Sequence, residues 1–76
     1  MSESHHLDAK GLKCPLPVLR ARKAMKDVPP GGELVVEATD PSAPADFRAF
    51  CETTGHTLGA QDEADGVYTI RLHKTG

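Results

Sequence analysis

Residues 7–26 read LDAKGLKCPLPVLRARKAMK and decide the fold of this 76-residue chain. The tetrapeptide Cys14-Pro15-Leu16-Pro17 predicts a helix start, because proline is tolerated in the first turn, where backbone N–H groups have no intrahelical acceptor. With Pro15 as the first helical residue, Cys14 occupies the N-cap position. The helix is expected to continue to about Lys26, before the proline and glycine residues that follow.

Apolar residues recur along this segment at the spacing of an amphipathic helix. The residues expected to face the core are Val18, Ala21, Met25 and Val28, with Leu19 and Ala24 beside them.

A strand is predicted on each side of this helix. Residues 5–9 alternate in polarity, and Gly11 then allows a turn that other residues resist. Residues 29–32, PPGG, predict a chain reversal, and residues 33–39 predict a β-rich second strand. A strand, a helix and a strand in this order predict two parallel strands joined by a crossover helix. The residues expected to face inward from the second strand are Leu34, Val36 and Ala38.

A second helix is expected after the turn at Asp40-Pro41, with Ser42 as its cap and Pro44 in its first turn. Gly55 ends it. Cys51 lies on the apolar stripe of this helix and is interpreted as a core residue. The members of that stripe are Phe47, Phe50, Cys51 and Thr54.

The end of the chain predicts a β-hairpin. Two strands, at about residues 56–61 and 67–73, are joined by residues 62–66, which end in the turn-forming pair Asp65-Gly66. The element order is therefore βαβαββ. We expect an α+β fold, a two-layer α/β sandwich in which two helices lie on one face of a four-stranded mixed sheet. Residues 1–76 form one domain, of which residues 1–4 are expected to be flexible.

Composition limits the function. With 38% hydrophobic residues, no tryptophan, one tyrosine and two phenylalanines, the core is small, so chemistry is expected at the surface rather than in a deep cavity. The first residues lack the apolar run of a secretory signal, and no apolar run is long enough to span a bilayer. Two cysteines are too few for a secreted disulfide scaffold, so we expect a cytoplasmic protein with reduced thiols.

Cys14 is the candidate reactive residue. The helix dipole, the N–H groups of Leu16 and Val18, and the neighbouring Lys10 and Lys13 all favour a thiolate. No acidic residue occurs between Asp8 and Asp27, so the pKa of Cys14 is predicted to be lowered. The alternative is that Cys14 is a small buried apolar residue, as most free cysteines are.

Charge is distributed unevenly. The formal net charge of −2 argues against unaided nucleic-acid binding, yet six of the nine lysines and arginines fall between Lys10 and Lys26. We expect a positive surface around Cys14, on which Lys10 and Arg20 contact a partner. The alternative is that these charges only solvate the outer face of the helix.

Residues 7–18, LDAKGLKCPLPV, resemble the hallmark of the TusA/SirA-like sulfur carriers, small βαβαββ proteins with a Cys-Pro-x-Pro helix start. The resemblance extends from about Leu7 to Lys74. Two departures are Leu16, where many members have a charged residue, and Lys13, where arginine is more usual. The other matching positions are residues 30–34, Asp40-Pro41, Asp46, Phe50-Cys51 and His56-x-Leu58.

The resemblance implies that Cys14 accepts a sulfane sulfur as a persulfide, with Gly11, Lys13, Pro15 and Pro17 as supporting motif residues. The implied donor is a cysteine desulfurase or a rhodanese-like protein, and the acceptor is a sulfur-relay protein. In the family such relays serve tRNA thiouridine synthesis, molybdenum-cofactor enzymes or sulfur oxidation. The resemblance thus implies a carrier in sulfurtransferase reactions rather than a free-standing enzyme. Separately, we expect a monomer with no cofactor, no metal, no membrane and no direct nucleic-acid partner.

Three other functions compete. A thiol-redox protein would need a resolving cysteine, and Cys51 is predicted to be buried on the other helix. A metal site would need ligands at a spacing such as Cys-x₂-Cys, which the four histidines and two cysteines do not provide. An RNA-binding regulatory module of the same fold would need a basic surface with aromatic residues for stacking, and no aromatic residue precedes Phe47.

Overall fold

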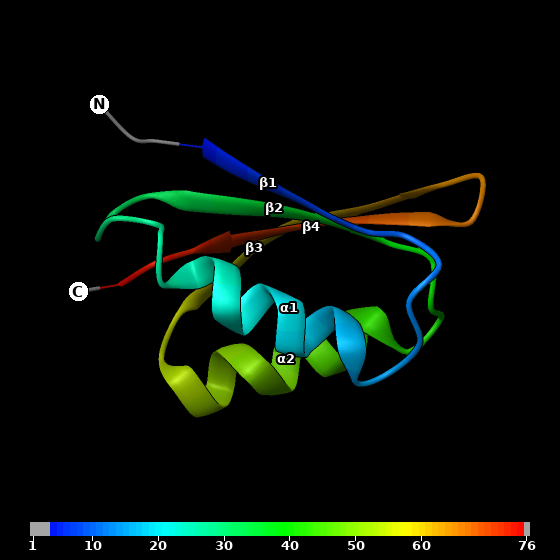
Figure 1. Ribbon diagram of the computed structural model, residues 1–76, viewed down its shortest axis with the longest axis horizontal. Helices are drawn as coiled ribbons and strands as arrows, with labels where there is room; N and C mark the ends of the chain where they lie inside the picture. The colour runs from blue at the N-terminus through cyan, green and yellow to red at the C-terminus, as the bar shows by residue number, and fades with distance from the viewer. Residues whose placement is uncertain (1–3, 76) are drawn as a thin grey trace.

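Two helices cover one face of a four-stranded sheet in the computed structural model, which describes residues 4–75 (Figure 1). The predicted order, βαβαββ, and the two-layer arrangement are confirmed. Of the residues expected to be flexible, 1–3 lie outside the described part of the chain, and Ser4 is the first residue of a strand. The elements are β1 Ser4–Ala9, α1 Leu16–Met25, β2 Glu33–Ala38, α2 Ala43–Thr54, β3 Thr57–Ala64 and β4 Val67–His73.

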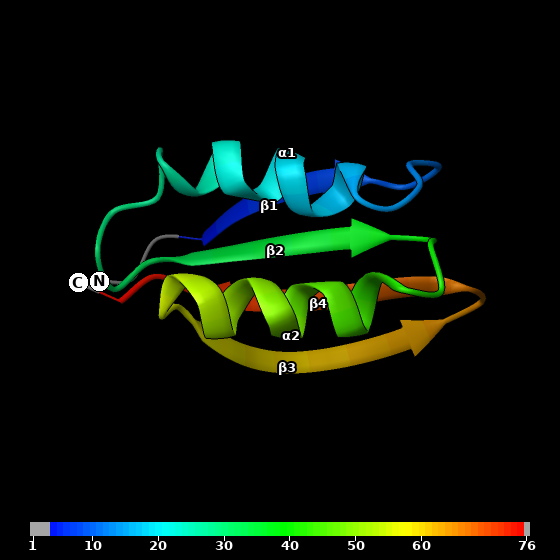
Figure 2. The same ribbon diagram turned by 90° about the horizontal axis from the view of Figure 1, so that it is seen from below.

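The sheet is mixed, with its strands in the order β1-β2-β4-β3. The expected parallel pairing is confirmed, because β1 pairs with β2 in parallel and α1 connects them. β4 pairs with β2 and with β3 in antiparallel fashion. Because β1 and β2 point the same way, both chain segments that enter the helices leave the sheet at the same edge, as Figure 2 shows.

The core lies between the sheet and the two helices. The predicted inward faces are confirmed for β2 and for Phe47, Phe50 and Cys51 of α2, whereas Thr54, the last member of that stripe, is exposed. In α1, however, Leu19 is 51% exposed, so its assignment beside the core was wrong. Leu19 precedes the buried Ala21 by two residues, which places it on the opposite side of a helix with 3.6 residues per turn. The largest fully buried side chains are Phe47, Leu34, Ile70, Leu72, Val28 and Val36.

The terminal hairpin is tighter than expected. Strand β3 continues to Ala64, so only Asp65 and Gly66 connect it to β4, and the predicted five-residue link was too long. Both turn residues have positive φ values, 51° and 81°, as a two-residue hairpin turn requires. No helix in the described part of the chain is long and apolar enough to cross a membrane.

Candidate functional site

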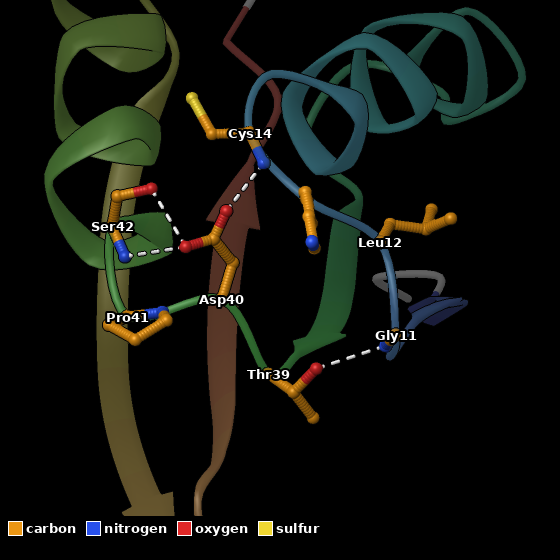
Figure 3. A pocket seen from close by; sticks show the side chains of 8 residues that line it. Gly11, Leu12, Cys14, Thr39, Asp40, Pro41 and Ser42 are labelled. Carbon is orange, nitrogen blue, oxygen red and sulfur yellow. Dashed lines mark hydrogen bonds between the residues drawn. The ribbon is translucent and has the colours of Figure 1, made fainter.

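Two loops meet at the edge of the sheet where both helices begin. The first joins β1 to α1 and contains Gly11 and Cys14, and the second joins β2 to α2 and contains Thr39 and Asp40. The Gly11 N–H donates a hydrogen bond of 2.9 Å to Thr39 Oγ1, and the Cys14 N–H donates one to a carboxylate oxygen of Asp40 (Figure 3). Segments far apart in the sequence are thereby held side by side.

A surface cleft of about 450 Å³ lies between these loops, and we call it the loop cleft. Figure 3 shows the Cys14 side chain directed toward the start of α2. The cleft is lined by Gly11, Leu12, Lys13, Cys14, Thr39, Asp40, Pro41 and Ser42.

Asp40 is the polar centre of this junction. Besides the bond from Cys14, its carboxylate accepts hydrogen bonds of 3.0 Å from the Ser42 N–H and from Ser42 Oγ. The backbone bonds from Ser42 and Cys14 are the main reasons why the pKa of Asp40 lies below its usual value. The ionised carboxylate thus fastens the first loop to the start of α2.

The start of α1 differs from the prediction by one residue. Pro15 is the N-cap and Leu16 is the first helical residue, so Cys14 lies just before the cap. The Leu16 N–H donates a 2.8 Å hydrogen bond to the carbonyl oxygen of Lys13. This N–H group therefore belongs to a backbone turn. The prediction that it stabilises the Cys14 sulfur was wrong.

The predicted lowering of the pKa of Cys14 was also wrong. The thiol is exposed, yet its pKa is raised, chiefly because hydrogen bonding to the Asp46 carboxylate stabilises the protonated thiol. Desolvation and the negative charges of Asp46 and Asp40 act in the same direction, while a hydrogen bond with Ser42 acts against them. The prediction counted acidic residues only along the neighbouring sequence. The carboxylates that matter come from the other loop and from the first turn of α2.

A second hollow, of about 280 Å³, also begins at Cys14 and lies between the two helices. Cys14 is thus exposed at the junction of two open hollows, where another macromolecule can reach it. The lining residues are Cys14, Pro15, Val18, Arg22, Asp46, Ala49, Phe50, Thr53 and Thr54.

The predicted supporting residues occupy different places. Gly11 adopts a positive φ of 81° that favours glycine, while Pro17 is buried in the first turn of α1. Lys13 lines the loop cleft. Lys10 lies within 3.7 Å of Asp8 and 3.9 Å of a second carboxylate, so it is directed toward the strands.

Arg20 is exposed on α1 and lines neither hollow. The sequence interpretation missed Ser42 and Asp46 as site residues, although the expected helix start at Ser42 was the signal that brings both to this edge. Ser42 Oγ lies 3.1 Å from Asp46 Oδ2 and so connects the two carboxylates around the thiol.

The second cysteine, Cys51, is buried and therefore not accessible to a reaction partner. Cys51 lies on the inner side of α2, is 6% exposed and packs in the hydrophobic core, as predicted. Burial raises the pKa of its thiol. Among residues 4–75, no three histidine, cysteine or acidic side chains are grouped closely enough to hold a metal ion.

The family model described as Sulfurtransferase TusA matches residues 5–74. The chain belongs to this TusA family. A "Putative sulfur carrier protein" of Neisseria meningitidis is 55% identical over 67 residues, which cover 88% of this chain and 90% of the relative. The sulfur carrier protein TusA of Pseudomonas aeruginosa is 46% identical over 68 residues, covering 90% of this chain and 86% of that protein.

The TusA fold assignment is supported by a solved structure. A SirA-like protein from Desulfitobacterium hafniense superposes with a TM-score of 0.80 over 93% of this chain and 97% of its own. At 24% identity, this likeness establishes the shared fold.

Proposed function

We propose that Cys14 carries a sulfane sulfur as a persulfide and passes it from a donor protein to an acceptor protein. The observation that supports this most directly is the exposure of Cys14 at the junction of two open hollows, while Cys51 is buried. The relatives are named sulfur carriers, which agrees with a residue that must be visited by two different proteins.

Loading is a thiol exchange in which no electrons are gained or lost overall. The Cys14 thiol gives up its proton, and the sulfur attacks the outer sulfur of the donor persulfide. The S–S bond of the donor breaks, its cysteine leaves as a thiolate and takes up a proton, and Cys14 becomes the persulfide. Unloading repeats the exchange, with the acceptor thiolate attacking the outer sulfur and Cys14 as the leaving group.

Asp46 has a definite role in this scheme. Its carboxylate is the hydrogen-bond acceptor that raises the pKa of Cys14, so it holds the free carrier as a neutral thiol. The same carboxylate is placed to receive the proton when the sulfur attacks. At a given pH, a smaller fraction of the Cys14 thiol is therefore ionised than in a thiol without this carboxylate.

The proposed donor is a cysteine desulfurase or a rhodanese-like protein. The proposed acceptor is a relay protein of tRNA thiouridine synthesis, molybdenum-cofactor enzymes or sulfur oxidation. We place the reaction in the cytoplasm, where protein thiols remain reduced, and expect the carrier to act as a monomer. Both hollows are open at the surface, which suits exchange between proteins better than turnover of an enclosed small molecule.

The test is label transfer from cysteine carrying radioactive sulfur, through a cysteine desulfurase, to the purified protein. Wild type and Cys51→Ser are expected to become labelled, and a reductant is expected to remove the label. Cys14→Ser is expected to remain unlabelled while keeping its circular dichroism spectrum. Labelling of the Cys14→Ser protein at the wild-type rate would overturn the proposal.

A further inference from the structure

The hydroxyl of Ser42 does not have the role that a serine at its position usually has. Ser42 is the N-cap of α2, and a serine there normally accepts a hydrogen bond from a backbone N–H group of the first turn. The Ser42 side chain forms no such capping bond. Instead, its Oγ lies 3.0 Å from Asp40 Oδ1 and 3.1 Å from Asp46 Oδ2. The hydroxyl is therefore directed at the groups around Cys14.

Two carboxylates compete for the single proton of this hydroxyl. A serine side chain has one O–H group and donates one hydrogen bond at a time, whereas Asp40 and Asp46 both lie within its reach. Asp40 does not depend on this donor, because the N–H groups of Ser42 and Cys14 also donate to its carboxylate. The Ser42 O–H group can thus turn away from Asp40 while that carboxylate keeps two hydrogen bonds.

The Cys14 sulfur is a further acceptor for this hydroxyl. Figure 3 shows the Cys14 side chain directed toward the start of α2, where Ser42 lies. Hydrogen bonding with Ser42 lowers the pKa of Cys14 and so favours the ionised sulfur, whereas Asp46 favours the protonated thiol. The two side chains therefore act on the same sulfur in opposite protonation states. The other charged side chains that line the hollows at Cys14 are Lys13, Arg22 and Asp40.

Negative charge develops on the Cys14 sulfur at a definite step of the proposed relay. In unloading, the acceptor thiolate forms a bond to the outer sulfur, the S–S bond breaks, and its electron pair stays on the Cys14 sulfur. The Cys14 thiolate then takes up a proton from solvent. A thiol leaves faster when its pKa is lower, so a hydrogen-bond donor to the Cys14 sulfur accelerates this step. An ionised Asp46 cannot supply it, because a carboxylate only accepts hydrogen bonds.

We propose that Ser42 is a catalytic residue of unloading, whose hydroxyl turns from Asp40 and Asp46 to the Cys14 sulfur and donates a hydrogen bond to it as the outer sulfur is transferred. This inference rests on the proposed function of Cys14 and adds a residue to it. In the free carrier the hydroxyl stays on the carboxylates, because a neutral thiol is a weak acceptor. The hydroxyl thus responds to the charge of the sulfur.

The first experiment measures unloading with a chemical acceptor, so that no partner protein is needed. Cys14 of the native protein is converted to a mixed disulfide with thionitrobenzoate, and one equivalent of sulfide displaces thionitrobenzoate to leave the persulfide. Cyanide then attacks the outer sulfur and forms thiocyanate, with Cys14 as the leaving group. Thiocyanate is expected to form about three- to tenfold more slowly in Ser42→Ala and Ser42→Gly than in wild type, because a hydrogen bond to a charged group is lost.

Matched variants separate the hydroxyl from the stability of α2. Glycine is tolerated at an N-cap, so Ser42→Gly removes the hydroxyl with little cost to the helix. Ser42→Thr keeps a hydroxyl and is expected to restore most of the wild-type rate. Thr57→Ala removes an exposed hydroxyl of β3 that lines neither hollow, and it is expected to react as wild type does. Wild-type rates in both hydroxyl-free variants, or a Ser42→Thr protein as slow as they are, would overturn the assignment.

The pH dependence of alkylation tests whether Ser42 contacts the sulfur or acts only through Asp46. Loss of a donor to the thiolate raises the pKa of Cys14, so the midpoint of iodoacetamide alkylation in Ser42→Ala is expected at higher pH than in wild type. The same displacement is expected when Ser42→Ala is combined with Asp46→Asn and compared with Asp46→Asn alone. No displacement in that background would show that Ser42 acts only through the carboxylate, and the direct contact would be refuted.

Loading by a cysteine desulfurase separates this role of Ser42 from the function of Cys14. Chemical loading and alkylation involve no desulfurase, so they measure the effect of Ser42 on the sulfur independently of any partner. A wild-type protein that an active desulfurase never loads would refute the function and leave the Ser42 measurements standing. Normal loading by the desulfurase, together with equal cyanide rates in wild type and the hydroxyl-free variants, would refute the role of Ser42 alone.

Discussion

At the scale of single residues, the reactivity of Cys14 is set by side chains that are distant in sequence. Lys10 and Lys13, which precede Cys14, favoured the prediction of a thiolate. However, the Asp46 carboxylate, in the first turn of α2, stabilises the protonated thiol. A hydrogen bond at short range outweighs lysines that are exposed to solvent, because screening by water weakens exposed charges. The pKa of the Cys14 thiol is therefore raised and not lowered.

Replacing the carboxylate should therefore activate the thiol. In Asp46→Asn the neutral form loses its stabilising acceptor and the nearby negative charge, so the pKa of Cys14 falls. At a pH below the pKa of both proteins, a larger fraction of Cys14 is thiolate in the variant than in wild type, so alkylation by iodoacetamide is faster in the variant. Rates measured across pH should show the midpoint displaced to lower pH, and Asp62→Asn, an exposed carboxylate of β3, should leave it in place. An identical midpoint in wild type and Asp46→Asn would show that Asp46 does not control the thiol.

Asp40 should act as a pH-dependent fastening between the two loops. Its pKa is lowered by the bonds from Ser42 and Cys14, so the stabilisation is complete above the ordinary aspartate pKa. It is lost as the pH falls through the lowered value, when the carboxylate takes up a proton. The protection factors of the Cys14 and Ser42 amides, measured by hydrogen exchange against the intrinsic rate at each pH, should fall in that acidic range, and in Asp40→Ala they should be low at neutral pH as well. Full protection of both amides in Asp40→Ala would contradict this role.

At the scale of elements, β3 departs from regular pairing next to a glycine. The register between β3 and β4 shifts between Leu58 and Gln61, and Gly59 lies within this irregular stretch. A Cβ added at Gly59 would lie 2.8 Å from His73 Nε2 and 3.2 Å from the Arg71 carbonyl oxygen. The exposed imidazole can move aside, whereas the backbone oxygen of a central strand cannot move freely.

Gly59→Ala is therefore expected to destabilise the protein by about 1 kcal/mol, at the low end of the cost of overpacking. Urea unfolding followed by circular dichroism measures this change. Ala60→Ser, at the next and exposed position, is the control and should be within about 0.5 kcal/mol of wild type. A Gly59→Ala protein as stable as wild type would show that the strand adapts without strain.

Helix α2 contributes its inner face to the core, and Cys51 is part of that face. Cys51→Ser places a hydroxyl in an apolar environment, which is expected to cost about 1–3 kcal/mol. Unfolding in urea gives the loss, and sulfur loading of the folded protein gives the control on function. Loading at the wild-type rate together with reduced stability is the expected pair of results. A loss of loading without a loss of stability would assign Cys51 a chemical role.

At the scale of the whole molecule, periodicity predicted the elements because each buries one face. The alternation at Leu34 and Val36 and the helical spacing of Phe47 and Phe50 follow directly from a single small core. Leu19 was predicted to lie beside the core but is exposed. Single apolar residues are common on the exposed side of a helix, so the local sequence did not exclude this position.

The site was harder to predict than the fold, because it is built from two loops that only the sheet brings together. The Cys-Pro-x-Pro stretch predicted Cys14 as the reactive residue. The carboxylates of Asp40 and Asp46 lie near Cys14 because β1 and β2 pair in parallel. The predicted parallel pairing did indicate that the loops after β1 and β2 lie close together, because parallel strands end at the same edge of the sheet. The pKa of Cys14 was wrongly predicted because only the charges near it in sequence were considered, whereas Asp40 and Asp46 lie near it in space.

The most direct test of the whole scheme is peptide mapping by mass spectrometry after incubation with a cysteine desulfurase and cysteine. The proteolytic peptide that contains Cys14 is expected to gain about 32 Da, the mass of one sulfur atom, and a reductant is expected to remove this added mass. The peptide that contains Cys51 should keep its unmodified mass. An added sulfur on Cys51 alone, or on neither peptide while the desulfurase itself is loaded, would contradict the account.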